Sequence, residues 1–149
     1  MKIYLGADHA GLELKNKLVD FLKEKGYEVE DKGAFKFDPN DDYPDFIEPV
    51  ADAVSKDPET RGVVIGGSGE GEAIDANRFK GVRATVYYGG SPNSGLEIVK
   101  LGREHNNANI LSLGARLISL DEAKRAVEIF LSTPFSGGRH ERRIEKLDD

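Results

Sequence analysis

The sequence contains no cysteine among its 149 residues. This absence excludes disulfide bonds and any reaction that depends on a thiolate. No segment approaches the run of about 20 apolar residues that a membrane helix needs, and the first residues, MKIYLGADHAG, lack the apolar stretch of a signal peptide. We therefore expect a cytoplasmic protein that has no membrane-spanning segment.

The sequence also has fewer basic than acidic residues. The chain has 21 lysines and arginines against 27 aspartates and glutamates, which gives a formal net charge of −6. This balance disfavours broad nucleic-acid binding, so we expect no nucleic-acid partner. The length is typical of one domain with a sizeable core, and no repeat or linker interrupts it. We expect a single domain over residues 1–149.

The most informative stretch runs from Val63 to Arg78 and reads VVIGGSGEGEAIDANR. A short β-branched run leads into a glycine-rich loop, and a helix is expected to follow. Such a loop forms a cradle of backbone N–H groups that, with the helix dipole, suits an anion. The alternative is an ordinary turn that uses glycine for its positive φ. The loop by itself leaves both readings open.

The loop lacks the features of two common nucleotide sites. It has neither the lysine and hydroxyl of a phosphate-binding P-loop nor the G-x-G-x-x-G spacing of a dinucleotide site. Glu70 and Glu72 would repel a permanently charged phosphate. A carboxylate beside N–H donors suits a reaction in which the base takes a proton and the donors stabilise the resulting oxyanion. The loop therefore predicts an enolate site.

Predicted strands and helices alternate along the chain. The strands are expected at Lys2–Ala7, Tyr27–Glu30, Val63–Ile65, Val82–Tyr87 and Asn109–Leu113. The helices are expected from Leu12 to an end at Gly26, and at Pro44–Ser55, Glu70–Arg78 and Ser94–Glu104. A further helix is expected from a cap at Asp121 to Leu131, and a last one over 137–147. Residues 32–42 and 89–95 are expected to be loops. This alternation predicts a three-layer α/β/α fold, a Rossmann-like five-stranded parallel sheet with helices on both faces. Ligands of such folds bind beyond the carboxyl ends of the strands.

Three further groups of residues could contribute to a site. Asp8 and His9 follow the first strand, where they could exchange protons, hold a hydroxyl or phosphate, or only cap a turn. Arg116 follows the fifth strand. Near the C-terminus, Arg139 and Arg143 stand at i and i+4 and could clamp one phosphate, although a solvated helix face is the alternative.

The segment Arg103-Glu104-His105-Asn106-Asn107 precedes the fifth strand and so belongs to its amino end. By the rule for parallel sheets, it should not reach the site of its own subunit. Either the segment is structural, or it completes the site of a neighbouring subunit across an interface.

These motifs together resemble those of a known family. Asp8-His9-Ala10-Gly11, Asp42-Tyr43-Pro44, the GGSGEGE loop followed by Asn77, Arg103 to Asn107 and Arg139 to Arg143 occur in this order in the ribose-5-phosphate isomerase B family, which also includes related aldose–ketose isomerases. The resemblance covers essentially the whole chain. It implies interconversion of ribose 5-phosphate and ribulose 5-phosphate, a step of the pentose phosphate pathway, through a cis-enediolate without metal or cofactor.

The resemblance also implies roles for individual residues. One branch of the family uses a cysteine as base at the position of Gly66, and the other uses a glutamate that matches Glu72. The chain resembles the glutamate branch. The ring-opening acid matches His105, and the substrate-binding positions match Asp8, His9, Gly67, Ser68, Gly69, Glu70, Gly71, Asn106, Arg116, Arg139 and Arg143. We expect a homodimer, or a dimer of dimers, whose sites are shared between subunits.

Two alternatives to this activity remain open. The same chemistry could act on a six-carbon sugar phosphate, allose 6-phosphate or galactose 6-phosphate, with pocket length set by residues 32–42 and 89–95. A non-catalytic sugar-phosphate-binding module on the same fold is the other alternative, because a fold does not fix a function.

One position departs from the family pattern. Many members have alanine where this chain has Asp75, three residues after Glu72. On a helix these two carboxylates would be neighbours. Their repulsion would raise the pKa of Glu72, whereas the helix N-terminus and the loop donors would lower it. We expect Glu72 to remain a competent base.

Overall fold

The computed structural model describes residues 1–90 and 95–148. In this part of the chain five parallel strands form one sheet in the order β2-β1-β3-β5-β4. The strands are β1 (Lys2–Ala7), β2 (Glu28–Asp31), β3 (Arg61–Gly66), β4 (Ala84–Tyr87) and β5 (Ile110–Gly114). The predicted parallel sheet is confirmed.

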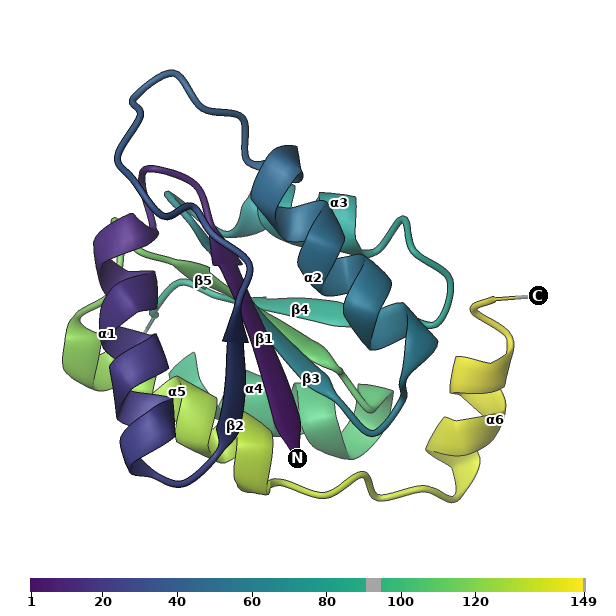
Figure 1. The fold of residues 1–149 in the computed structure, drawn as a ribbon. Coiled ribbons are helices and arrows are strands. Elements are labelled where there is room, and N and C mark those ends of the chain that lie inside the picture. Colours follow the sequence, from purple (N-terminus) through teal and green to yellow (C-terminus); the bar gives the residue numbers. More distant parts are fainter. Residues whose placement is uncertain (91–94, 149) are drawn as a thin grey trace.

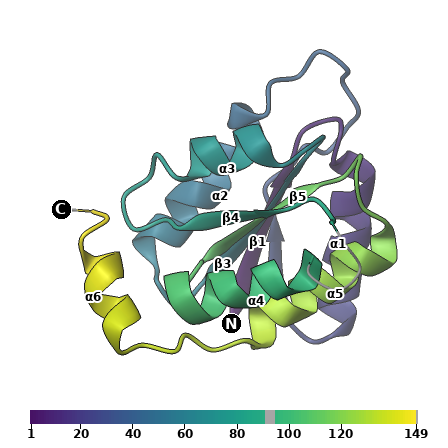
Figure 2. The same cartoon turned by 180° about the vertical axis from the view of Figure 1, so that it is seen from behind.

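Helices cover both faces of this sheet (Figures 1 and 2). They are α1 (Leu12–Glu24), α2 (Pro44–Lys56), α3 (Glu70–Ala76), α4 (Gly95–Asn106), α5 (Leu120–Ser132) and α6 (Arg139–Glu145). α2 and α3 lie on one face, and α1, α4 and α5 lie on the other, whereas α6 stands apart from the sheet beyond the end of α4. The three-layer α/β/α architecture is therefore confirmed. None of the described helices is long and apolar enough to cross a membrane.

Two hydrophobic cores follow from the alternation of side chains along the strands. In β3, Val63 and Ile65 join the core beneath α1, α4 and α5. Val64 between them joins the second core, which includes Val50 and Val54 of α2. β3 is thus apolar on both faces, as expected of a central parallel strand.

The chain order of the strands creates a topological switch point at their carboxyl ends. β1 lies between β2 and β3, and the chain leaves β1 for α1 on one face but leaves β3 for α3 on the other (Figure 1). The loops after these adjacent strands therefore diverge. Such switch points form the ligand crevices of open α/β sheets. Asp8 and the glycine-rich loop follow β1 and β3 and so lie at this position.

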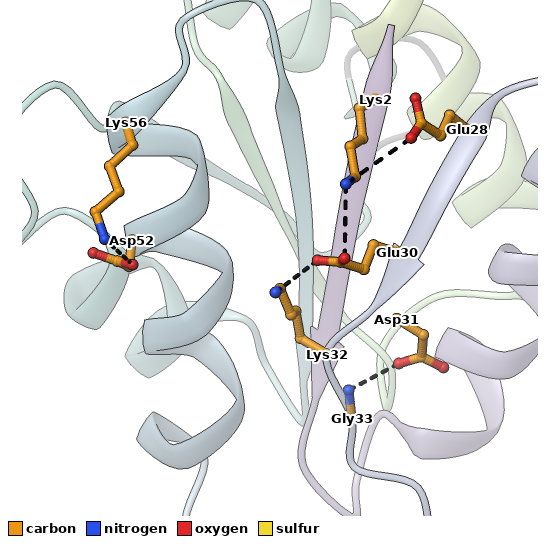
Figure 3. Close-up of polar contacts among 8 residues, drawn as sticks. All are labelled: Lys2, Glu28, Glu30, Asp31, Lys32, Gly33, Asp52 and Lys56. Carbon is orange, nitrogen blue, oxygen red and sulfur yellow. Dashed lines mark hydrogen bonds and ion pairs between the residues drawn. The ribbon is translucent and has the colours of Figure 1, made fainter.

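The edge strand β2 is held to β1 by charged side chains as well as by the backbone ladder. Figure 3 shows Lys2 of β1 bridging Glu28 and Glu30, and Lys32 contacting Glu30 from the other side. Paired acidic and basic side chains keep a sheet edge soluble and discourage further strand pairing. Lys56 and Asp52 form a similar surface pair one turn apart on α2.

Several predicted boundaries need correction. Ser119, not Asp121, caps α5: its hydroxyl accepts a hydrogen bond from the Glu122 N–H, so the helix begins at Leu120. α3 ends at Ala76 rather than Arg78, and β4 begins at Ala84 rather than Val82, because the Asn77 side chain bonds both backbone groups of Ala84. α6 is shorter than the predicted 137–147. Ser94, where α4 was expected to begin, lies outside the described residues.

Candidate active site

Glu72 lies at this switch point, shortly after the carboxyl end of β3. Gly69, with a φ of +85°, turns the loop into α3, and Glu72 follows in the first helical turn. The residue is 5% exposed, and its side chain folds back over Gly66 at the end of β3. A Cβ atom built on Gly66 would lie 1.6 Å from Glu72 Oε1. The carboxylate therefore occupies the space that a side chain at position 66 would need.

The surroundings of Glu72 favour its protonated form. Burial raises the pKa of Glu72, and the negative charges of Asp8 and Glu70 raise it further, while a hydrogen bond from its own backbone N–H acts in the opposite direction. A carboxylate with a raised pKa is a stronger base at neutral pH than an ordinary glutamate. The geometry thus supplies a general base beside the glycine-rich loop.

Asp75 does not have the predicted effect on Glu72. The charges that raise the pKa of Glu72 come from Asp8 and Glu70. Burial raises the pKa of Asp75 itself, the charge of Glu48 in α2 raises it further, and Arg78 lowers it. The prediction that Asp75 is the like charge that raises the pKa of Glu72 is therefore wrong, because Asp8 and Glu70 supply that charge.

Asp8 and His9 lie where the crevice rule predicted. Asp8 is buried, and its Oδ1 accepts a hydrogen bond from the Ala10 N–H. The turn packs tightly on β3, since a Cβ on Gly11 would come within 2.8 Å of the Ile65 carbonyl oxygen. Asp8 is thereby close enough to Glu72 to influence its ionisation.

The loop after β5 brings Arg116 to the same place. Its backbone N–H donates to the Gly67 carbonyl oxygen at 3.1 Å, and a Cβ on Gly67 would lie 3.0 Å from its Nη1 atom. Within the glycine-rich loop, the Ser68 hydroxyl accepts from the Glu70 N–H. The structure thus brings together Asp8, His9, Arg116, Glu72 and the loop Gly67–Gly71.

Two neighbours of this crevice were not predicted as site residues. Tyr43, at the start of α2, places its hydroxyl 3.0 Å from where a Cβ on Gly71 would lie. Asp41 contacts His9, and single ligand atoms of Asp8, His9 and Asp41 all lie within 4.8 Å of one another. Such a group could bind a cation. Here, however, Asp41 and the His9 ring are hydrogen-bonded to each other, which occupies two of the three possible ligand atoms. In the sequence, Asp41 was one acid in a polar loop.

A second group of predicted residues gathers at the other end of the sheet, near the amino end of β5. His105, Asn106 and Arg143 line a hollow of about 280 Å³ with His140, Ile144 and Leu147. The His105 and His140 rings stack with their centroids 4.3 Å apart. Burial, followed by the charges of His105 and of Arg139 and Arg143 in α6, lowers the pKa of His140. Such an arrangement favours an anionic ligand.

The structure does not bring this hollow to Glu72. His105 and Asn106 end α4, which leads into the amino end of β5, whereas Glu72 lies at the carboxyl ends of the strands. Arg139 and Arg143 extend from this same region on the exposed helix α6 (Figure 2). For His105 and Asn106 this is the placement that the crevice rule predicts for the segment Arg103–Asn107.

Arg103 fixes the turn that carries His105 and Asn106. It is buried and donates to the carbonyl oxygens of Thr133 and Ala108 and to Oδ1 of Asn107, which adopts a positive φ of 46°. Burial, with the nearby charges of other arginines, lowers its pKa to about 10. Arg103 is thus a structural member of the motif and still cationic at neutral pH.

The comparisons of this chain with known proteins all point to the same family. The model of the Ribose/Galactose Isomerase family matches residues 3–147. The chain is 43% identical over 148 residues to ribose-5-phosphate isomerase B of Mycobacterium leprae, covering 99% of this chain and 88% of that protein. It is 40% identical to the Escherichia coli enzyme of the same name, covering 98% and 93%.

A solved structure agrees with these relatives. Ribose-5-phosphate isomerase B from Mycoplasma genitalium with bound ribulose-5-phosphate superposes with a TM-score of 0.91 at 41% identity, covering 98% of this chain and 93% of that one. Fold and sequence thus agree over nearly the whole chain. The chain belongs to the ribose/galactose isomerase family.

Proposed function

We propose that the protein is an aldose–ketose isomerase that interconverts ribose 5-phosphate and ribulose 5-phosphate. The observation that carries this proposal is Glu72, a buried carboxylate with a raised pKa that is held against a loop of backbone N–H groups. The relatives named ribose-5-phosphate isomerase B and the ribulose-5-phosphate bound to one of them support the choice of substrate.

Proton transfer by Glu72 is the chemical step. Glu72 removes the proton from C2 of the open-chain aldose and returns it to C1, while a proton passes from O2 to O1. Backbone N–H groups of Gly67–Gly71 and the Ser68 hydroxyl hold the enediolate oxygen. A general base contributes about 10²–10⁴-fold to the rate, and one oxyanion donor lowers the barrier by about 3–4 kcal/mol. Both contributions are needed for rapid turnover.

The remaining roles are divided between two subunits. His9 and Arg116 belong to the same chain as Glu72, and they contact the phosphate of the substrate. His105, which opens the furanose ring, and Asn106, Arg139 and Arg143 come from a partner in a homodimer or dimer of dimers. His105 and Asn106 precede the amino end of β5, and α6, which carries Arg139 and Arg143, packs against α4. This placement away from Glu72 of the same chain supports the division.

Subunit sharing predicts complementation between two inactive variants. We expect Glu72→Gln and His105→Asn homodimers each to be nearly inactive. A purified heterodimer of the two, carrying different affinity tags, has one site with both wild-type residues and should show about half of the wild-type turnover. A heterodimer of Glu72→Gln with Glu72→Ala is the matched control and stays inactive. A mixed heterodimer no more active than this control would contradict shared sites.

Substrate length separates the main proposal from its alternatives. We expect kcat/KM for ribose 5-phosphate to exceed that for allose 6-phosphate and galactose 6-phosphate by at least about tenfold, because one additional carbon must fit the same pocket. Steady-state kinetics with all three substrates makes the comparison. A preference for a six-carbon substrate would assign the protein to the sibling activity. Binding of ribose 5-phosphate without any ketose formation would indicate a binding module.

A further inference from the structure

The loop between β2 and α2, residues 32–42, is anchored against the end of β1. Its first part continues the β2–β1 ladder, because Lys32 donates to the Leu5 carbonyl oxygen and Ala7 donates to that of Gly33, both at 2.8 Å. Asp31 accepts from the Gly33 N–H, as Figure 3 shows, and also holds the fully buried Lys15 at 2.6 Å. The loop therefore leaves the sheet beside Asp8 in a fixed direction.

At its far end this loop delivers Asp41 to His9. Asp41 Oδ1 lies 2.6 Å from His9 Nδ1 and 3.2 Å from the His9 backbone nitrogen. The Asp41 side chain is 8% exposed and that of His9 is 24% exposed. Among the described residues, the Asp41 carboxylate bonds only His9, 32 residues away in the sequence. By contrast, Asp38 in the same loop bonds the nearby Asn40 N–H. Asp41 thus differs from Asp38, because its hydrogen bonds join the loop to the turn after β1.

This contact selects the state of the His9 ring. Nδ1 must carry the proton that it donates to the carboxylate, so Nε2 points away from Asp41 and is left for another partner. Oδ2 of Asp41 is buried without a hydrogen-bond partner among the described residues. A buried carboxylate is costly unless a positive group compensates it. The arrangement therefore favours a cationic imidazole at His9.

The other groups around His9 agree with this assignment. The hydrogen bond with Asp41 is the main influence that raises the pKa of His9, and the charges of Asp8 and Asp41 add to it. Burial and the positive charge of Arg116 act in the opposite direction. The edge of His9 also meets Phe37 of the loop, with ring centroids 6.0 Å apart. His9 thus lies between two carboxylates and the arginine of the candidate site.

We propose that Asp41 is a positioning residue for substrate binding: it holds His9 with Nε2–H directed to the anionic phosphate of the sugar. This inference rests on the proposed function, because it assigns His9 to the phosphate. Asp41 does not touch substrate. It fixes the orientation of the imidazole and retains its positive charge to higher pH, and both effects strengthen a charge-assisted hydrogen bond to phosphate.

The expected effect depends on pH. Protonated His9 binds phosphate, and Asp41→Asn lowers the pKa of His9, so the variant loses this contact at a lower pH than the wild type. Above both pKa values, KM for ribose 5-phosphate should rise about tenfold for each unit by which the pKa falls. Below both values KM should approach that of the wild type, because the asparagine oxygen still accepts from Nδ1–H. We expect kcat to change little at any pH.

The pKa of His9 can be measured without activity. The chain has three histidines, so a ¹H–¹⁵N NMR titration assigned with His9→Gln resolves each ring. We expect Asp41→Asn to shift the His9 titration to lower pH and Asp38→Asn, the matched control, to leave it unchanged. Asp41→Ala removes the acceptor too and should raise KM even at low pH. Adding inorganic phosphate should perturb the His9 resonances of the wild type more than those of either Asp41 variant.

Each outcome decides the inference. An unchanged His9 titration in Asp41→Asn would overturn it. So would a phosphate-induced change in the His9 resonances that is equal in the wild type and both Asp41 variants. A KM increase that is the same at every pH would also overturn it and indicate a merely structural role for the loop. If wild-type protein fails to isomerise ribose 5-phosphate but His9 still responds to phosphate in an Asp41-dependent way, the proposed function fails while the positioning role stands.

Discussion

Replacing Glu72 by glutamine is expected to lower kcat for ribose 5-phosphate by about 10²–10⁴-fold, the contribution of a general base. Glutamine has the size of glutamate but cannot accept the C2 proton. KM should change little, because the loop donors that contact the substrate are retained. A coupled or direct assay of ketose formation measures the effect. An activity within about tenfold of wild type would contradict the assignment of Glu72 as base.

The stability of this variant separates catalysis from folding. The raised pKa of Glu72 means that folding favours its protonated form, so its contribution to the free energy of unfolding declines as pH rises through the ordinary glutamate range and up to the folded pKa. Glu72→Gln removes that cost at neutral pH, and its melting temperature should equal or exceed that of wild type. Asp75→Asn, one helical turn away and facing Glu48, is the matched control and should keep its activity.

The second large effect is expected at Gly66. An alanine Cβ there would lie 1.6 Å from Oε1 and 2.1 Å from Cδ of Glu72, far inside contact distance. The clash must displace the carboxylate from the end of β3. Since a base displaced by about 1 Å can lose 10²-fold in rate, we expect Gly66→Ala to lower kcat by about that factor or more. Thermal unfolding monitored alongside the kinetics reports any loss of fold.

A double-mutant cycle tests whether this loss acts through Glu72. In a Glu72→Ala background the carboxylate is absent, so Gly66→Ala should cause no further decrease in kcat. Independent, additive losses would show that position 66 affects turnover by another route. The same geometry explains why a cysteine at position 66 and a glutamate at position 72 would compete for one space in this chain.

The fold could be predicted from the sequence because its signals are strong and local. Val63 to Ile65 is a short β-branched run between polar segments, and the amphipathic helices repeat on both sides of it. The errors fall at boundaries where two residues offer similar signals. Ser119 and Asp121 are both good capping residues, and the local hydrogen bonds between Ser119 and Glu122 place the cap at Ser119. The start of β4 depends on the side chain of Asn77, which lies outside the strand in the sequence.

The site was predictable where topology determines it. Asp8 and Glu72 follow adjacent parallel strands, so the crevice rule was sufficient to place them together, and the same rule separated His105 from them. Asp41 was not predictable, because its position depends on the path of a polar loop across the end of β1. The need for Gly66 was hidden for a related reason: it depends on the direction in which the Glu72 side chain folds.

Solvent deuterium exchange tests the central claim most directly. Ribose 5-phosphate is incubated with the protein in D₂O, and NMR follows both ketose formation and deuterium incorporation at C2. Wild-type protein should form ketose and incorporate deuterium at C2. Glu72→Gln should show neither reaction at a rate comparable to that of the wild type. If the wild type forms ketose and Glu72→Gln retains wild-type exchange, the base is another residue, and the account of the glycine-rich loop as an enediolate site is wrong.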